Sequence, residues 1–366
     1  MSNQYRNPWT KQEIRILYDW VKPGVKIRDL ELKLPRRTYE AIKTKLKVLG
    51  IKKGDVKGIN KKDITDRIVE IAEKAFGSSP AVKKPVIFKI KKGKHQEEIA
   101  LLKFSDSHVG KKTVTYNPRV FIERLENLKK AIMKIITPLR TIREIKKLVI
   151  VFEGDIIDAE SIYPGQAVDG ISETILTQIF GTTVPELHNF LLFCLDNFEE
   201  VECHCVKGNH GKLNAAKWSS SKSTNWDLVV YKVLEAVTKN QDRLKWNIIE
   251  NDWKVIFKIF NHGFLACHGD MIKSYMNLPF YGMIRQATRW QSAYSSKIWI
   301  EHFLFAHFHS AVAGIRFNQV NIYVNGPFVT DDEFAEEKLG VTSVPEQVLL
   351  GVHPKYGVTW RYILRL

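Results

Sequence analysis

The sequence of 366 residues contains little cysteine and no long apolar run. Its four cysteines, at positions 194, 203, 205 and 267, are too few for the disulfide scaffold of a small secreted protein. No apolar run reaches the roughly 18–20 residues that a membrane-spanning helix needs. The polar start MSNQYRNPWT also lacks an apolar signal core. We therefore expect a soluble, globular, cytoplasmic protein without a membrane partner.

Acidic residues are the minority among the charged ones. The chain has 56 Lys and Arg against 40 Asp and Glu, a net charge of +16. Residues 1–60 alone hold 15 basic and 6 acidic residues, which is more than half of the excess. Such a local excess favours a polyanionic partner such as nucleic acid, and a solvated basic surface is the alternative.

Three short helices are predicted in this basic segment. Thr10 and Glu13 have the spacing of a capping box, and TKQEIRILYDWV continues with apolar residues at helical spacing. A second helix fits KIRDLELKL. A third is predicted in RRTYEAIKTKLKVLG, beginning after Pro35 and ending at Gly50.

The third helix combines an apolar side with a basic side, which is typical of a helix-turn-helix reader of DNA. The segment also resembles Myb/SANT-like helix-turn-helix modules, although only Trp9 and Trp20 remain of their regularly spaced tryptophans. A three-helix module that packs or binds protein is the alternative. The residues that we predict to contact DNA are Arg36, Arg37, Lys43 and Lys47.

We predict three parts along the chain. Residues 1–58 form the helix-turn-helix domain. Residues 59–98 link it to the rest, with a helix in DITDRIVEIAEKAF and a hairpin that turns at KKGK. Residues 99–366 form the main domain.

In the main domain, apolar strand-like runs end in side chains that can bind metals. The runs are IALLKFSDSHVG, KKLVIVFEGDIID, VECHCVKGNHGK, GFLACHGD and HFLFAHFHS, with helical stretches between them. This alternation predicts a layered α/β domain with its functional groups at the carboxyl ends of strands. The polar residues at these ends are Asp106, His108, Asp155, Asp158, Asn209, His210, His268, His307 and His309.

The order and chemistry of these motifs resemble the calcineurin-like metallophosphoesterases, which carry D-x-H, G-D-x-x-D, G-N-H, H and G-H-x-H. The resemblance spans about residues 99–315 and implies a four-layer sandwich of two mixed β-sheets flanked by helices. DSHVG is similar to the nucleases of double-strand-break repair and to phage-encoded relatives, and the tail GVHPKYGVTWRYILRL is similar to phage-type members. One position departs from the family pattern, because Ala306 stands where the family has glycine.

The resemblance implies two divalent metal ions with Asp155 as the bridging ligand. The first ion would also be held by Asp106, His108 and His309. The second would also be held by Asn209, His268 and His307. His210 would touch the phosphate or protonate the leaving oxygen, and Asp158 would orient its other ring nitrogen.

Carboxylate, amide and imidazole donors without thiolate favour Mn²⁺, with Fe²⁺, Zn²⁺ or Mg²⁺ as alternatives. In an extended segment alternate side chains align, so His307 and His309 are predicted to face the cleft and Phe308 to point away. The CHC sequence at 203–205 does not predict a zinc site, because strand alternation separates His204 from both cysteines.

These patterns predict a metal-dependent phosphodiesterase that hydrolyses DNA, located in the cytoplasm, or in the host cytoplasm if the protein is viral. A homodimer is expected from the resemblance. A phosphatase or diesterase for a nucleotide or other small phosphoester is the first alternative. The second is a DNA-binding or replication-accessory subunit without turnover.

Overall fold

The structure is a computed structural model that describes residues 10, 13, 16–17, 26–48, 61–87, 97–160, 170–212, 224–274, 279–331 and 343–366. The chain divides into two compact units, Met1–Asp66 and Arg67–Leu366. Among the helices in these described ranges, none has the length and apolar character to cross a membrane.

The amino-terminal unit contains the second and third predicted helices, whereas most of the first, TKQEIRILYDWV, lies outside the described residues. α2 spans Ile27–Lys33 and α3 spans Tyr39–Val48. The predicted capping box of the first helix is present, because the Thr10 amide donates to Glu13 Oε2 at 2.8 Å and the Glu13 amide donates to Thr10 Oγ1 at 3.1 Å. The helices enclose a small apolar core of Leu17, Leu30, Leu34, Ile42 and Leu46.

α3 begins later than predicted. Thr38 caps it, since its Oγ1 accepts from the Ala41 amide at 3.3 Å and its carbonyl accepts from the Ile42 amide at 3.0 Å. Arg36 and Arg37 therefore precede the helix and do not lie on it. The predicted end at Gly50 lies outside the described residues.

The larger unit contains two mixed sheets. The six-stranded sheet has the order β11-β10-β1-β2-β3-β4, and the five-stranded sheet has the order β5-β6-β7-β9-β8. The first is formed by β1 (Glu97–Phe104), β2 (Glu144–Phe152), β3 (Glu200–Cys205), β4 (Leu244–Ile248), β10 (Glu346–His353) and β11 (Gly357–Arg365). The second is formed by β5 (Lys254–Ile259), β6 (His262–Cys267), β7 (His302–Phe305), β8 (Val312–Phe317) and β9 (Val320–Val324).

Neighbouring strands β1 to β4 are parallel, as are β6, β7 and β9, whereas β5, β8, β10 and β11 pair antiparallel. Parallel strands require crossovers, which here are largely helical. The helices of this unit are α4 (Lys61–Phe76, which begins in the first unit), α5 (Pro118–Leu139), the π-helical turn η3 (Thr177–Thr183), α6 (Val184–Asn197), α7 (Trp226–Val237) and α8 (Pro279–Tyr294).

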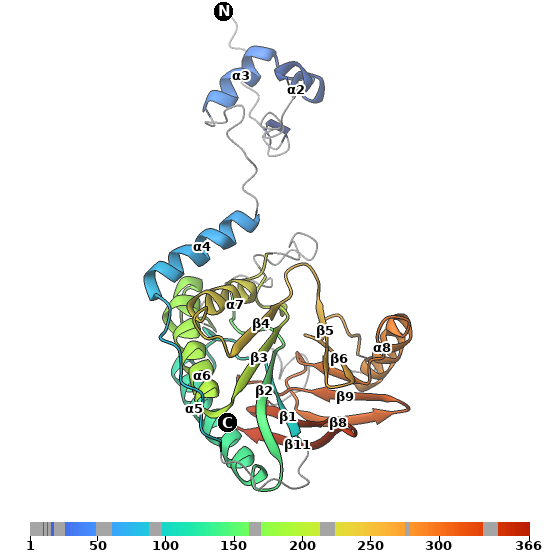
Figure 1. Ribbon diagram of the computed structural model, residues 1–366. Helices are drawn as coiled ribbons and strands as arrows, with labels where there is room; N and C mark the ends of the chain where they lie inside the picture. The colour runs from blue at the N-terminus through green and yellow to red at the C-terminus, as the bar shows by residue number, and fades with distance from the viewer. Residues whose placement is uncertain are drawn as a thin grey trace, which may run out of the picture. The chain divides into compact units, whose positions relative to one another are not determined.

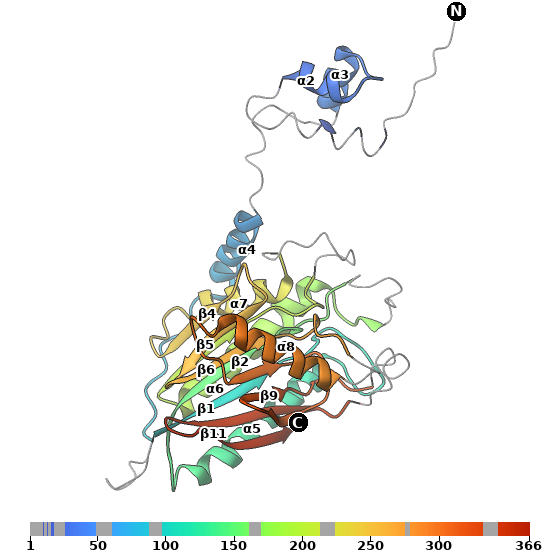
Figure 2. The ribbon, with the colours of Figure 1, turned by 90° about the vertical axis from the view of Figure 1, so that its right-hand side faces the viewer.

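Strand alternation builds four layers from these elements. Along β1, Leu102 packs toward the helices and Leu101 packs between the two sheets. Along β6, Ala266 faces the other sheet, whereas Leu265 packs toward α8. Figure 1 shows α5, α6 and α7 outside the six-stranded sheet, and Figure 2 shows α8 across the outer face of the five-stranded sheet. The predicted α/β sandwich of two mixed sheets flanked by helices is confirmed.

The predicted linker is present in part. Its helix is α4, and the second strand of the predicted hairpin is β1. The remainder of that hairpin, in 88–96, lies outside the described residues.

Candidate metal centre

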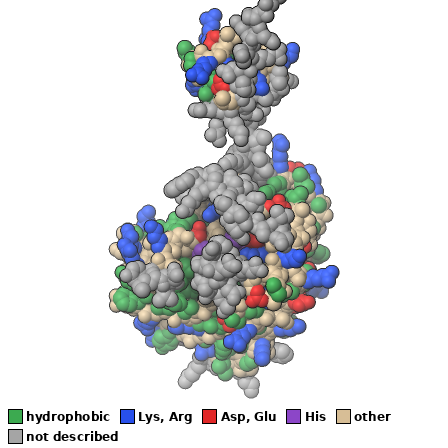
Figure 3. All heavy atoms as spheres, turned by 180° about the vertical axis from the view of Figure 1, so that it is seen from behind, with side chains coloured by type: hydrophobic (Ala, Val, Ile, Leu, Met, Phe, Trp, Pro, Cys, Tyr) green, Lys and Arg blue, Asp and Glu red, His purple; other side chains and the backbone are tan. Residues whose placement is uncertain are grey.

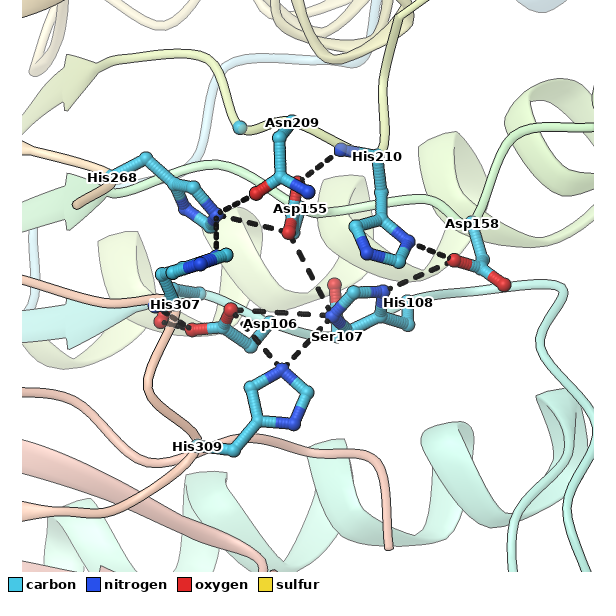
Figure 4. A network of polar contacts seen from close by, with 12 residues as sticks. Asp106, Ser107, His108, Asp155, Asp158, Asn209, His210, His268, His307 and His309 are labelled. Atoms are coloured by element: carbon cyan, nitrogen blue, oxygen red, sulfur yellow. Dashed lines mark hydrogen bonds and ion pairs between the residues drawn. The ribbon is translucent and has the colours of Figure 1, made fainter. Parts of the chain in front are cut away.

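All five predicted motifs follow the carboxyl ends of strands. Asp106 follows β1, Asp155 follows β2, Asn209 follows β3, His268 follows β6 and His307 follows β7. The two sheets bring these ends to one edge of the sandwich, where the nine predicted side chains meet (Figure 4). The site therefore joins segments separated by about two hundred residues of sequence, as the motifs predicted.

The first donor group contains Asp106, His108 and His309. His108 Nε2 and His309 Nε2 lie 3.3 Å apart, and Asp106 Oδ1 lies 3.6 Å from His309 Nε2 and 4.0 Å from His108 Nε2. These are the three residues predicted for the first ion.

The second donor group contains Asp155, His268 and His307, with Asn209 beside them. His268 Nε2 lies 2.8 Å from Asn209 Oδ1, 3.0 Å from Asp155 Oδ2 and 3.2 Å from His307 Nδ1. Asp155 Oδ2 also lies 3.9 Å from His108 Nε2 of the first group. Asp155 is thus placed between the two groups, as a bridging ligand requires.

The donor atoms fit cations better than they fit one another. Asp106 Oδ1 is buried without a hydrogen-bond partner, although an unpaired buried carboxylate oxygen is costly. The facing nitrogens of His108 and His309 cannot satisfy each other without at least one proton. Two divalent cations would satisfy all of these lone pairs, and the buried His and Asp clusters are consistent with a dinuclear centre.

Electrostatics supports the same interpretation. Burial opposes ionisation of Asp155, but the rings of His268 and His210 outweigh it and hold the pKa of Asp155 well below its usual range. For His268, burial lowers the pKa, but attraction by Asp155 outweighs this and raises it to about 10. The carboxylates thus draw positive charge onto the histidines, and cations would supply the same charge.

The ligands stand on strained backbone. Five of the seven predicted ligands have left-handed φ angles: Asp106 (51°), His108 (42°), Asp155 (52°), His307 (73°) and His309 (50°). Non-glycine residues rarely adopt this conformation, and it clusters at functional sites where the surrounding structure enforces it.

His307 and His309 both face the centre and Phe308 points away, as predicted, but the predicted cause, strand alternation, is wrong. β7 ends at Phe305, and both histidines stand in a bend with positive φ. The bend sends His307 to the second donor group and His309 to the first, while Phe308 packs among the side chains under α8. The division between the two groups therefore arises from a turn. Ala306 does not have a positive φ, so its methyl group is accommodated without that strain.

Asp158 contacts two imidazoles. Its Oδ1 hydrogen-bonds to Nδ1 of His210, the contact expected from the sequence, and lies 3.2 Å from Nδ1 of His108. The His210 amide donates to Asp155 Oδ1 at 2.7 Å. Burial lowers the pKa of His210, but the carboxylates of Asp155 and Asp158 outweigh this and raise it above the usual value.

Asp227 is a supporting residue that the sequence analysis missed. Its fully buried carboxylate accepts from the amides of Asp155 (3.1 Å), Ile156 (3.1 Å) and Gly208 (2.9 Å), which joins the loops after β2 and β3. Burial raises the pKa of Asp227 to about 6. Asp227 lies at the start of α7, outside every motif, so no sequence pattern assigned it to the site.

A buried ion pair lies behind the ligand loops. Lys103 Nζ is 3.3 Å from Glu153 Oε2, and neither side chain is exposed. Lys103 also donates to the carbonyls of Phe305 (2.8 Å) and Tyr323 (2.7 Å), while the Glu153 carbonyl accepts from His268 Nδ1 at 2.8 Å. This bond leaves His268 Nε2 as the lone-pair donor. The sequence feature that could have predicted this buried ion pair is the lysine within the apolar run IALLKF.

The residues predicted to contact DNA differ in their surroundings. Arg37 is only 11% exposed and pairs with both carboxylate oxygens of Glu13, at 2.8 and 2.9 Å, so its guanidinium is engaged within the amino-terminal unit. Arg36, Lys43 and Lys47 are exposed. Lys43 lies 3.9 Å from Glu40, a weak surface pair.

The four cysteines are buried free thiols. Cys203 and Cys205 pack in the core under the helices, whereas the His204 ring stacks on Phe257 with ring centres 4.0 Å apart. The alternation predicted for CHC is confirmed.

The insert after His268 forms α8, which packs on the five-stranded sheet through Met283 and Trp290. Phe280 and Tyr281 are exposed at its start. α8 is thus a core helix on one face and carries exposed aromatic side chains at its start.

The centre is partly open to solvent. Among its residues, Asn209, His210, His307 and His309 are partly exposed, and the rest are buried. Figure 3 shows histidine reaching the surface of the larger unit, beside acidic and basic side chains.

No protein-family model and no curated protein matches the chain. Solved structures with partial likeness include wild-type Vps29 of Entamoeba histolytica complexed with zinc (11% identity, TM-score 0.33, covering 73% of this chain and 99% of that one). Others are Vps29 of Cryptosporidium parvum (11%, 0.35, 74% and 100%) and the phosphoesterase YfcE of E. coli (13%, 0.29, 73% and 100%). Likenesses this low decide neither family nor substrate, so the functional conclusion must come from the donor groups.

A substitution at Gly154 tests whether metal binding depends on the close approach of the loops after β2 and β3. A Cβ at Gly154, whose φ is +87°, would lie 2.1 Å from the Gly208 amide nitrogen. We expect Gly154→Ala to separate the loops after β2 and β3, lowering the melting temperature by several degrees and weakening metal binding about tenfold or more. Thermal unfolding and metal titration measure both.

Gly77→Ala is the matched control, because Gly77 has φ +66° but no atom within 4 Å of its Cβ position. It should cost only about 1–2 kcal/mol of local strain and leave metal affinity unchanged. Wild-type metal affinity in Gly154→Ala would contradict this account of the loops.

Proposed function

We propose that the chain is a metal-dependent phosphodiesterase that hydrolyses DNA, with a dinuclear centre at the edge of the sandwich. The observation that carries the proposal is the pair of buried donor groups that share Asp155. A shared carboxylate flanked by mixed nitrogen and oxygen donors suits two cations at the short spacing used for phosphoryl chemistry.

When bound, two divalent cations would neutralise charge on the phosphoryl oxygens and supply hydroxide at neutral pH. The first would be held by Asp106, His108 and His309, the second by Asn209, His268 and His307, with Asp155 between them. We favour Mn²⁺, because the donors are carboxylate, amide and imidazole and the nearby Cys267 is buried in the core.

His210 is the proposed proton donor to the leaving oxygen. It is partly exposed on the open side of the centre, and Asp158 holds its Nδ1. The raised pKa keeps a larger fraction of the ring protonated near neutral pH, which suits a general acid. Asp158 also contacts the His108 ring. The same carboxylate therefore orients both the proposed general acid, His210, and a proposed metal ligand, His108.

DNA is the proposed substrate because a basic unit is carried on the same chain. Its exposed cations Arg36, Lys43 and Lys47 surround a small helical core. Positive charge tethered to a phosphodiesterase raises the local concentration of a polyanion at the active site. A small phosphoester would gain little from it, which is why we place DNA first.

Metal removal is the first test. Chelation should abolish hydrolysis of linear DNA, circular DNA and a chromogenic phosphodiester, and Mn²⁺ should restore all three. Asp155→Asn should weaken both ions and lower the rate roughly 100-fold or more, whereas Asp106→Asn should mainly remove the first ion. Full activity after chelation, with metal absent by elemental analysis, would exclude the proposal.

His210→Ala tests the proton donor. We expect it to retain both ions and lose about 10²–10⁴ in turnover. The wild-type rate should fall as pH rises through the raised pKa of His210, and the variant should lack this alkaline limb. A variant without bound metal would instead make His210 a ligand.

Charge reversal tests the DNA assignment. Arg36→Glu, Lys43→Glu and Lys47→Glu together should reduce the log–log salt dependence of DNA binding by about 3 and weaken binding, leaving hydrolysis of the chromogenic diester unchanged. The matched control reverses three exposed cations of α5: Arg119, Lys130 and Lys134. Equal losses in both triple variants would show that the amino-terminal unit is not a specific anchor.

A further inference from the structure

A further donor group lies at the opposite end of the five-stranded sheet. His262 opens β6, and His302 opens β7 directly after Glu301. His262 Nδ1 lies 2.8 Å from Glu301 Oε2, and His302 Nε2 lies 3.6 Å from the same oxygen. None of these residues contributes to the centre described above, which follows the other ends of β6 and β7.

The outer nitrogens of both rings are already engaged. His262 Nε2 donates to the Pro354 carbonyl at 3.2 Å, and His302 Nδ1 lies 3.2 Å from the Tyr323 hydroxyl. A neutral His262 that donates from Nε2 presents a lone pair at Nδ1, where it faces the Glu301 carboxylate. Such contacts to the far nitrogen are what orients histidines that bind metals.

His302 supplies the decisive observation. It is 4% exposed, and its Nε2 is buried with no hydrogen-bond partner among the residues that the structure describes. A proton on His262 Nδ1 would form a hydrogen bond to Glu301. His302 Nε2 would still lack a hydrogen-bond partner. A cation among the three donors would satisfy all of them.

The surroundings leave room beside the donors. Gly357 has φ +68°, and a Cβ there would lie 3.2 Å from His302 Nε2 and 3.5 Å from His262 Nδ1. Tetrahedral zinc sets its ligand atoms about 3.3 Å apart, and the separations of 2.8 and 3.6 Å fall on either side of this. Glu301 is one-third exposed, so water can complete the coordination.

We propose that His262, Glu301 and His302 bind a further divalent transition-metal ion, with Zn²⁺ the best match to two imidazoles and one carboxylate. Pro354 and Gly357 flank the turn between β10 and β11, in the other sheet. The ion would therefore crosslink the starts of β6 and β7 at the edge remote from the dinuclear centre, and the hydrogen bond from His262 to Pro354 joins this cluster to the other sheet, so its role is structural.

The test uses the full-length protein and zinc alone. Zinc bound per chain is measured by elemental analysis after loosely held metal has been removed, and melting temperature is followed against zinc concentration. We expect Glu301→Gln and His302→Gln each to bind one zinc fewer than wild type and to lose a zinc-dependent rise of about 5 °C. Asp155→Asn should retain this ion, which separates it from the dinuclear centre.

His188→Gln is the matched control, because His188 Nε2 also lacks a hydrogen-bond partner but the residue belongs to no donor group. It should keep the wild-type stoichiometry. Glu301→Gln alters a partly exposed side chain, and circular dichroism checks that it folds. Wild-type zinc content and wild-type zinc-dependent stabilisation in both folded variants would overturn the proposal.

Discussion

Three carboxylates buried at one edge of the sandwich are the constraint around which the larger unit is arranged. Asp106, Asp155 and Asp158 are each at most 1% exposed, and their mutual repulsion in a poorly polarisable interior must be offset by positive charge. Histidines from four strand ends meet this need in part, and divalent cations would complete it. This charge balance makes the site costly without bound cations and would favour divalent ions.

The ligands also need a rigid frame. Their left-handed backbone is strained, and only the surrounding structure can keep it in that conformation. Asp227 joins two ligand loops of the six-stranded sheet through three amide hydrogen bonds. Lys103, on β1, reaches across to carbonyls of β7 and β9. The frame thus ties both sheets to one site, so stability of the sandwich and geometry of the centre are coupled.

The sequence was sufficient to predict elements with strong local patterns. Alternating strands and helices predicted the two-sheet sandwich, and polar residues after apolar runs predicted which side chains meet. It was not sufficient for features fixed by tertiary contacts. The bend at His307 has no turn signature, Asp227 stands outside every motif, and Arg37 is used in an ion pair with a residue 24 positions away. Each depends on neighbours that are distant in sequence.

Exposure at the centre limits how a phosphoester can approach. The first-strand ligands Asp106 and His108 are buried, whereas His210, His307 and His309 are partly open. A phosphate bound at the centre would therefore lie beside these partly open residues, with His210 on one flank and His307 and His309, which follow β7, on the other. At this edge of the sandwich the proposed substrates are a phosphate within a chain, as in DNA, or a terminal one, as in a small phosphoester. The basic amino-terminal unit would then decide between these substrates by supplying a polyanion preferentially.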